Sequence, residues 1–390
     1  MVLRSTGMPL VLATAAMGFS GFSLLLPISP LWAVEGGADE FGAGLATTVL
    51  MAFTVLTQLQ VNRWLARFGW TAVVAVGLLA LGVPAALQAL SPELWLILVT
   101  QALRGVGFGI LTVCGSTAVA LLVPPEMRGR GIGLYGLSAA LPQLGLMTLS
   151  PLLADWLGIR ATLVLGLVPV LGLLWVSKLG RVVEERGGRS LVEAKGGGVG
   201  VLARIWVPII ALLLVTASGG AVLTFAPQLV ESTGVAMLVL FAVTAVAAVG
   251  RYAVGPLCDR FGTGPFVWSL LLIAALGVVG VALALGVGGF AWLIIGAGVL
   301  GLSYGALQTV TLVRAYADAG EENRPGASVA WNVGFDVGTG LGAMAIGALA
   351  QGWSFGTAFW ATAAACAVAA LLVGVVDLVR SPRPSAAARG

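Results

Sequence analysis

The sequence predicts an all-α polytopic membrane protein in which twelve transmembrane helices form two six-helix bundles related by pseudo-two-fold symmetry. Charge is scarce, since Lys, Arg, Asp and Glu make up only 9% of the 390 residues, while 59% are hydrophobic. An average soluble chain is about 25% charged, so a soluble protein of this length would lack the charge to cover its surface. Twelve long apolar stretches and a repeat at half the chain length complete the prediction.

The apolar stretches are long enough to cross a bilayer, which takes about 20 helical residues. Each is continuously apolar rather than alternating, and in lipid every backbone group must find its partner within the segment, so helices are expected rather than a β-barrel. The first stretch lacks a small-residue cleavage site and is expected to remain as a span. The predicted spans are residues 9–32, 42–62, 70–90, 94–123, 131–153, 159–179, 204–230, 234–254, 264–286, 290–316, 327–350 and 356–379.

Positive residues predict the orientation, because Lys and Arg concentrate in cytoplasmic loops. With a cytoplasmic N-terminus, 18 of the 20 Lys and Arg residues fall on the inner side, Arg160 falls on the outer side and Arg104 lies within a span. We therefore expect a multi-pass protein of the inner (plasma) membrane with both termini in the cytoplasm. The inner-side residues are Arg4, Arg63, Arg67, Arg128, Arg130, Lys178, Arg181, Arg186, Arg189, Lys195, Arg204, Arg251, Arg260, Arg314, Arg324, Arg380, Arg383 and Arg389.

The longest break between spans runs from Lys178 to Arg204 and contains nine of the 36 charges. It divides six spans from six and is expected to be a solvated linker, with a regulatory or partner site as the alternative. The predicted domains are a six-helix bundle at residues 1–179, a cytoplasmic linker at 180–203, and a second six-helix bundle with a short tail at 204–390.

The two halves repeat one another at an offset close to half the chain length. Arg67-Phe-Gly69 matches Arg260-Phe-Gly262 at an offset of 193, and Gly107-Phe-Gly109 matches Ser303-Tyr-Gly305 at an offset of 196. Copies that start on the same side of the membrane predict a parallel repeat about an axis along the membrane normal, with a substrate path between the halves.

Several motifs carry a family resemblance. Gly255-Pro-Leu-Cys-Asp-Arg-Phe-Gly262 resembles the G-x-L-x-D-R-x-G loop of the major facilitator superfamily. Its counterpart in the first half, Asn62-Arg-Trp-Leu-Ala-Arg-Phe-Gly69, keeps the frame but has Ala66 in place of the Asp. Leu103-Arg104-Gly-Val-Gly-Phe-Gly109 is similar to the Arg motif of the family's fourth span. The resemblance covers essentially the whole chain and is closest to the twelve-span drug and sugar efflux branch, the arabinose efflux permease-like group.

The resemblance implies gating residues in these loops. The carboxylate of Asp259 can meet a helix N-terminus or an Arg near the cytoplasmic face and so favour one closed arrangement, together with Gly255, Arg260, Gly262 and, in the first half, Arg67. The alternative is an ordinary turn between helices in which Arg260 follows the positive-inside pattern.

The fifth span carries a further motif. Ser138-Ala-Ala-Leu-Pro142-Gln-Leu-Gly145 resembles a degraded form of the family's antiporter motif. This resemblance implies that Pro142 and Gly145 bend the span at the interface between the halves and contribute to gating. The alternative is plain packing of small residues, since 56 of the 390 residues are Gly.

Two ionisable residues, Arg104 and Asp336, lie away from both membrane faces, where such residues are costly and by default indicate function. Asp336 lies on a polar stripe of the eleventh span, and similar stripes run along the tenth and second spans. We expect a water-accessible substrate cavity lined by Gln101, Arg104, Tyr304, Gln308, Thr311, Asn332, Asp336, Thr54 and Gln58.

Our hypothesis is that Asp336 is the protonatable group that couples transport to a proton gradient, because dehydration favours the neutral form of a carboxylate. Arg104 would tune a proton step or hold an anionic group of the substrate. The structural alternatives are that Asp336 is hydrogen-bonded to Asn332 or to a neighbouring helix, and that Arg104 satisfies backbone carbonyls.

The predicted function is secondary active transport of a small amphiphilic or neutral organic solute by alternating access, with proton-coupled efflux as the direction. Proton-coupled or facilitated uptake of a sugar or metabolite is one alternative, and a membrane sensor that moves no solute is another. The expected partners are the small-molecule substrate, protons and the lipid bilayer, and the chain is expected to be a monomer.

Other functional classes are not expected. The chain has no His, which removes imidazole-based catalysis and metal binding, and no G-x-x-x-x-G-K-[ST] loop for a nucleotide. The three Cys residues have no C-x-x-C spacing, so neither a metal site nor a cofactor is expected. Nucleic acid is not an expected partner, since no Lys/Arg cluster with interleaved aromatics occurs.

Overall fold

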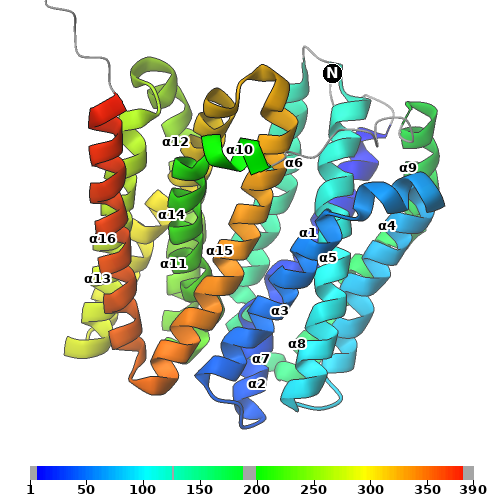
Figure 1. Ribbon diagram of the computed structural model, residues 1–390. Helices are drawn as coiled ribbons and strands as arrows, with labels where there is room; N and C mark the ends of the chain where they lie inside the picture. The colour runs from blue at the N-terminus through cyan, green and yellow to red at the C-terminus, as the bar shows by residue number, and fades with distance from the viewer. Residues whose placement is uncertain (1–6, 125–126, 188–198, 381–390) are drawn as a thin grey trace, which may run out of the picture.

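The structure is a computed structural model that describes residues 7–124, 127–187 and 199–380. Within these residues twelve helical segments are long and apolar enough to cross a membrane, which confirms the predicted number and fold class (Figure 1). The segments are Met8–Glu35, Glu40–Gln58, Val61–Gln88, Leu94–Leu122, Arg130–Leu157, Ile159–Glu185, Trp206–Leu229, Thr233–Phe261, Gly264–Val287, Phe290–Ala319, Gly326–Gly352 and Phe355–Val379.

Several of the membrane-spanning segments consist of more than one helix. The short helix α10 precedes α11 and is not part of a membrane-spanning segment. The first half contains α1 (Met8–Leu25), α2 (Ile28–Glu35), α3 (Glu40–Gln58), α4 (Val61–Gln88), α5 (Leu94–Leu122), α6 (Arg128–Pro142), the π-helix η3 (Gln143–Met147), α7 (Thr148–Leu157), α8 (Ile159–Leu165), the 3-10 helix η4 (Val168–Gly172) and α9 (Leu173–Glu185). The second half contains α10 (Val199–Arg204), α11 (Trp206–Leu229), α12 (Thr233–Phe261), α13 (Gly264–Val287), α14 (Phe290–Ala319), the 3-10 helix η6 (Glu321–Asn323), α15 (Arg324–Gly352) and α16 (Phe355–Arg380). Part of the predicted linker, residues 188–198, lies outside the described residues.

Two glycines form turns at equivalent places in the repeat, Gly69 within α4 and Gly262 directly after α12. Gly69 has φ 80° and ψ 167°, and Gly262 has φ 75° and ψ 175°. A side chain with a Cβ is strained at such positive φ values, so both turns require glycine. The predicted end of the second span, residue 62, lies past the end of α3 at Gln58, and the helical residues from Val61 to the turn at Gly69 belong to α4.

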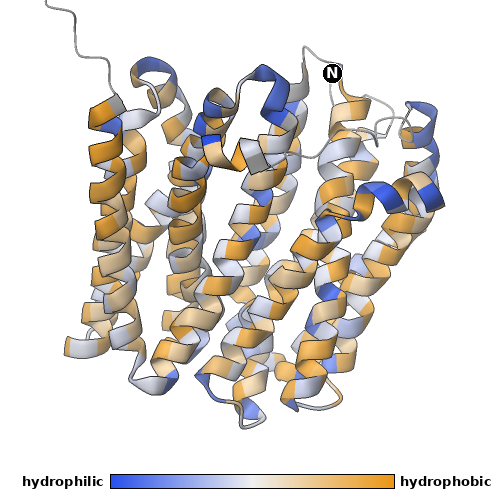
Figure 2. Cartoon of the chain, in the orientation of Figure 1, coloured by the Kyte–Doolittle hydropathy of each residue, from blue (hydrophilic) through white to orange (hydrophobic). Residues whose placement is uncertain are grey.

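The molecule has two chemically different ends. We call the end at which α1 begins and α16 ends the basic end, because exposed arginines such as Arg63, Arg67 and Arg260 lie there. The opposite end carries acidic residues, including Glu35 and Asp39. Between the two ends hydrophobic residues dominate the helices, as Figure 2 shows, and this distribution fits a lipid-facing belt.

The two bundles pack against each other mainly through α3 and α15, at the opposite end (Figure 1). A Cβ on Gly44 of α3 would meet the backbone of Ala343, and a Cβ on Gly347 of α15 would meet the backbone of Glu40. Contacts of α7 with α12 and of α2 with α11 add to this surface. Among the described residues, α6 and α9 at the basic end of the first bundle have no comparable packing against the second bundle. The bundles are therefore closed against each other at the opposite end.

Candidate functional site

A hydrogen bond between the two bundles lies at the centre of the candidate site. The side-chain amide of Gln58, the last residue of α3, donates to Oδ2 of Asp336 on α15 at 2.9 Å, and its Nε2 also lies 3.4 Å from Oγ1 of Thr112 on α5. Asp336 is buried, with 5% of its surface exposed. Asn332, the alternative partner within α15, instead donates to the carbonyl of Ser328 at 2.8 Å. The structure thus pairs Asp336 with a residue of the other bundle.

Small residues on α15 allow this approach. Gly340 lies one turn after Asp336, and a Cβ there would lie 3.0 Å from Cβ of Met51 on α3. Oγ1 of Thr48 donates to the carbonyl of Gly340 at 2.8 Å. Because α3 and α15 meet backbone to side chain at these positions, the short side chain of Asp336 reaches Gln58 directly.

A second polar group lies within the second bundle. The guanidinium of Arg251 on α12 donates to Oε1 of Gln308 on α14, and the amide of Gln308 donates to the carbonyl of Tyr304 at 3.0 Å. The ring of Tyr304 lies 6.2 Å, centroid to centroid, from that of Phe335, the residue that precedes Asp336. The structure therefore brings together four of the predicted residues, Gln58, Asp336, Tyr304 and Gln308, and adds Arg251 to them.

The sequence assigned Arg251 to the inner side of the membrane, and the structure places it deeper. Arg251 lies ten residues before the end of α12, about 15 Å along the helix axis. Sequence reasoning missed it because the predicted span ended at residue 254, before Pro256 and the loop motif, so that Arg251 looked like a residue of the membrane face. The signal that could have found it is that the helix continues through the motif as far as Phe261.

Three aromatic side chains line the junction of α14 and α15 beside this group. The ring centroids of Tyr304 and Phe335 are 6.2 Å apart, and those of Phe335 and Trp331 are 5.9 Å apart. Nε1 of Trp331 donates to Oγ1 of Thr311 at 3.0 Å. We call Tyr304, Phe335 and Trp331 the aromatic row. Its two members on α15 are half-buried, so they present apolar surface beside the polar groups.

The structure places Arg104 elsewhere, in the core of the first bundle. It is fully buried and donates to Oε1 of Gln101 at 2.5 Å, to the carbonyl of Gly21 at 3.0 Å and to Oγ of Ser29 at 3.4 Å. All of these partners belong to α1, α2 and α5. Thr54 likewise donates to the carbonyl of Gly105 at 3.2 Å within the packing of α3 on α5. No hydrogen bond joins Arg104, Gln101 or Thr54 to Asp336 among the described residues.

The predicted gating loops lie at the basic end. Asp259 is exposed and forms no ion pair with any described residue. The guanidinium carbon of Arg260 lies 5.0 Å from the ring centroid of Phe261, and that of Arg67 lies 5.3 Å from the ring of Phe68. The second-half loop, which runs from Gly255 to Gly262, and its first-half counterpart are thus similar in local contacts as well as in sequence.

In the first half, a carboxylate from another helix lies next to the loop that lacks an acid. Oε1 of Glu184, near the end of α9, accepts a hydrogen bond of 2.9 Å from the backbone amide of Trp70. Trp70 follows the turn at Gly69, where the longer part of α4 begins, and a negative charge stabilises such a helix N-terminus. Glu184 therefore binds beside the loop in which Ala66 replaces the acid of the motif.

The fifth span has an irregular helix where the motif predicted a bend. Pro142 ends α6 and is followed directly by η3, a π-helical segment, and such segments interrupt the regular helical hydrogen bonding. A Cβ on Gly133, Gly136 or Gly145 would meet no atom within 4 Å. Tight packing of small residues, the alternative at these positions, is therefore not what the structure shows. The gating role of Pro142 and Gly145 stays a prediction.

Arg314 is another arginine that the sequence assigned to the inner side. It is buried in α14 and forms two hydrogen bonds with the carboxylate of Asp377 on α16, at 2.9 and 2.5 Å. Asp318 lies 3.6 Å away on the same helix. Arg314 is thus neutralised by two acids and ties α14 to α16, in contrast to Arg251.

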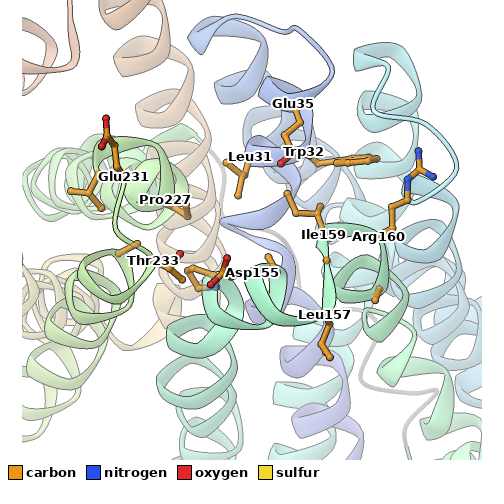
Figure 3. Close-up of a pocket in the computed structure, with 16 residues that line it drawn as sticks. Leu31, Trp32, Glu35, Asp155, Leu157, Ile159, Arg160, Pro227, Glu231 and Thr233 are labelled. Carbon is orange, nitrogen blue, oxygen red and sulfur yellow. The ribbon is translucent and has the colours of Figure 1, made fainter.

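A cavity of about 490 Å³ lies between the bundles at the opposite end (Figure 3). Its walls include Trp32 and Glu35 of α2 and Arg160 of α8 on one side, and Glu231 and Thr233 on the other. The guanidinium carbon of Arg160 lies 5.7 Å from the ring of Trp32. Both bundles thus contribute walls to this cavity, which borders the closed contact.

Comparison with known proteins identifies the family. Residues 10–321 match the family model described as Major Facilitator Superfamily. A relative from Bacillus subtilis (strain 168), the uncharacterized MFS-type transporter YhcA, is 30% identical over 108 residues, which cover 27% of this chain and 19% of YhcA. The chain thus matches only about a fifth of that relative's length.

Solved structures of transporters share the fold along nearly the whole chain. The inward open xylose transporter XylE from E. coli has a TM-score of 0.73 at 15% identity, covering 96% of each chain. A bacterial homolog of the human lysosomal transporter Spinster, inward-facing and occupied, has a TM-score of 0.74 at 15% identity, again covering 96% of each. A POT family transporter in complex with 5-aminolevulinic acid has a TM-score of 0.75 at 13% identity, covering 96% of this chain and 97% of that one. The chain, a multi-pass membrane protein, therefore belongs to the major facilitator superfamily of transporters.

Proposed function

We propose that this transporter moves a small organic solute by alternating access coupled to protons, with Asp336 as the coupling group. The observation that carries the proposal is the hydrogen bond from Gln58 to the buried carboxylate of Asp336, which joins the two bundles. A buried ionisable residue in a span is costly and indicates function. Because this carboxylate lies at the contact between the moving parts, a change in its charge acts directly on that contact.

Protonation would change the strength of this link. A hydrogen bond to an ionised carboxylate is roughly twice as strong as a bond between neutral groups. Adding a proton to Asp336 therefore weakens the bond from Gln58 and favours the arrangement in which the two residues separate. A solute that binds the two arrangements differently shifts the same equilibrium, which couples the two events.

The gating residues complete the proposed cycle. We place Asp259 in the loop that closes the basic end, where its exposed carboxylate would gain a partner from the first bundle. The irregular segment after Pro142 supports a bend of the fifth span during this closure. We place the basic end in the cytoplasm, because Lys and Arg concentrate on that side of a membrane.

Efflux in exchange for protons is the first direction that we propose, with a neutral or amphiphilic solute that uses the site alternately with the proton. The resemblance of the fifth span to an antiporter motif and its irregular helix support it. It would place the chain in the drug and sugar efflux branch of the family.

Uptake of a metabolite together with a proton is the second direction, and Arg251 favours it. An anionic group held near Asp336 favours the protonated carboxyl, and by reciprocity the proton favours the bound anion. A solute and a proton that favour each other's binding would cross the membrane together.

The experiment uses purified full-length protein in proteoliposomes, with a pH-sensitive dye inside the vesicles and a panel of neutral, cationic and anionic solutes outside. We expect solute-dependent proton flux, whose sign distinguishes exchange from co-transport. Asp336→Asn should abolish proton flux but retain solute counterflow. Asp155→Asn, which removes an acid at the opposite end, is the matched control and should behave as wild type. Unchanged proton flux in Asp336→Asn would overturn the coupling role.

A further inference from the structure

Arg251 is an arginine inside a membrane span without an acidic partner among the described residues. The two other arginines that lie well inside spans are accounted for in different ways. Arg314 has two carboxylates, and Arg104 is fully buried among hydrogen-bond acceptors. Arg251 is instead exposed. An unpaired charge at this depth is costly, and such residues face the interior of a bundle or a water-filled space.

The neighbours of Arg251 show that it faces protein rather than lipid. Its guanidinium bonds to Gln308, of which only 6% of the surface is exposed, and its carbonyl accepts a hydrogen bond from Thr309 at 3.4 Å. One turn earlier, α12 and α14 meet so closely that a Cβ on Gly305 would overlap the backbone of Ala247. The side chain therefore emerges along the seam between α12 and α14, beside Tyr304.

Most of the donors of this guanidinium are available. An arginine carries five N–H donors, and among the described residues Arg251 uses one of its nitrogens, in the bond to Gln308. Gln308 is itself held by the carbonyl of Tyr304. The bond thus fixes the orientation of the guanidinium and leaves one edge free for a planar anion such as a carboxylate.

The internal repeat indicates what is missing opposite Arg251. At the offset of 193 Arg251 corresponds to Gln58, and at the offset of 196 Gln308 corresponds to Thr112. The side chains are paired in the same way, since Gln58 contacts Thr112 and Arg251 contacts Gln308. Gln58 reaches across to the carboxylate of Asp336.

The position in the first half that corresponds to Asp336 is Ala140 on α6. The first bundle therefore offers no carboxylate to Arg251 at the place where the second bundle offers one to Gln58. A bound anion would complete the symmetric arrangement from the space between the bundles.

We propose that Arg251 binds the anionic group of the solute, and that the solute is a small organic monocarboxylate whose apolar or ring-bearing body lies against the aromatic row. This inference rests on the proposed transport function. Trp331 and Phe335 are half-buried beside Gln308 and Thr311 and supply the apolar surface. Together they would select a solute with one charged end and one apolar end.

The test compares carboxylates with their uncharged amides on the purified full-length protein. Phenylacetate, benzoate, hexanoate and pyruvate are titrated in a thermal-shift assay, each against its amide. At least one carboxylate is expected to stabilise the protein with a half-saturating concentration at least tenfold below that of its amide. Amides that match every carboxylate would overturn the proposal, and this comparison needs no variant.

Variants assign the effect to Arg251. Arg251→Gln should weaken carboxylate binding roughly 10- to 100-fold, the usual worth of a hydrogen bond to a charged group, and Arg251→Lys should retain part of it. Arg63→Gln, which removes an exposed arginine that bonds to Gln60, is the matched control. Carboxylate preference that survives in folded Arg251→Gln would overturn the assignment.

Failure of this inference is distinguishable from failure of the transport function. Asp336→Asn should keep the carboxylate preference in the binding assay while losing proton flux. If Arg251 were only a distant counter-ion of Asp336, its substitution would alter proton flux without changing the carboxylate preference, and the inference would be wrong. Carboxylate binding without counterflow would instead count against transport alone.

Discussion

Asp336 accepts a 2.9 Å hydrogen bond from Gln58, and the two residues belong to different six-helix bundles. The bond lies on the packing surface of α3 and α15, where glycines let the helices approach closely. A carboxylate could bind a proton anywhere in the protein, but only at such a contact does its charge affect the relative position of the bundles. The location of Asp336, more than its burial, makes it the candidate coupling residue.

Replacing Gln58 with Leu should shift the protein away from the arrangement closed at the opposite end. The substitution removes the one hydrogen-bond donor that the Asp336 side chain has among the described residues. Leaving a buried acceptor unsatisfied costs about 1 to 3 kcal/mol, which corresponds to a population shift of roughly 5- to 150-fold. Distances between spin labels across the basic end would report the two populations.

The matched control for this prediction is Gln60→Leu, two residues after Gln58, which breaks an exposed hydrogen bond from Arg63. It should leave the populations as in wild type. Asp336→Asn keeps an acceptor for Gln58 but removes the charge, so it should shift the populations in the same direction as Gln58→Leu and by a smaller amount. Equal distance distributions in Gln58→Leu and wild type would show that the bond does not bias the equilibrium.

Replacing Arg104 with Ala should destabilise the fold without uncoupling protons from solute. The change leaves Gln101, Ser29 and the carbonyl of Gly21 without a common donor, and each unsatisfied buried group costs about 1 to 3 kcal/mol. We expect a lower Tm in detergent and less folded protein, with an unchanged ratio of protons to solute in what remains. If Arg104→Lys restores the Tm but not that ratio, Arg104 takes part in transport as the sequence suggested.

The sequence predicted the helices well because membrane spans are determined by local composition. A continuous apolar stretch has to form its own backbone hydrogen bonds in lipid, whatever its neighbours are. The repeat followed from motifs such as the turns at Gly69 and Gly262, which need glycine for a positive φ. These properties are local, so one sequence is enough to read them.

The candidate site was predictable only in part, because polar stripes do not reveal which neighbour they face. Gln58 and Thr54 lie one turn apart on one stripe, but Gln58 bonds across the bundles while Thr54 packs on α5. Arg104 and Arg251 differ in the same way, since two of the acceptors around Arg104, Gly21 and Ser29, lie 83 and 75 residues earlier in the chain. Only the packing of the helices shows that most donors of Arg251 have no partner within the part of the chain that the structure describes.

Replacing Gly44 with Val should prevent the bundles from closing at the opposite end. A Cβ at this position would overlap the backbone of Ala343, which cannot move aside as a flexible side chain can. The variant should populate the alternative arrangement and transport slowly, and labels across the opposite end should report an increased separation. Gly298→Val, at a position where a Cβ would make only ordinary contact, should transport normally. Normal closure in Gly44→Val would show that the two helices slide past each other.

Linking residues 39 and 351 should arrest transport in the closed arrangement. The amide of Gln351 on α15 bonds to the carboxylate of Asp39 at the start of α3, so cysteines at these positions come from different bundles. The native residues Cys114, Cys258 and Cys366 are buried and should not compete for reagent.

A short reducible cross-linker should abolish counterflow, and reduction should restore it, because alternating access requires the two helices to separate here. The loss of the Asp39 cap on α3, an acceptor for the amide of Gly42 at 2.7 Å, should cost only about 1 kcal/mol. The control pair has cysteines at Ser354 and Thr357 of the second bundle, whose hydroxyl oxygens Oγ and Oγ1 lie 3.1 Å apart. Linking this pair should leave counterflow intact. Counterflow that continues after complete cross-linking of positions 39 and 351 would mean that solute crosses without separation of α3 from α15.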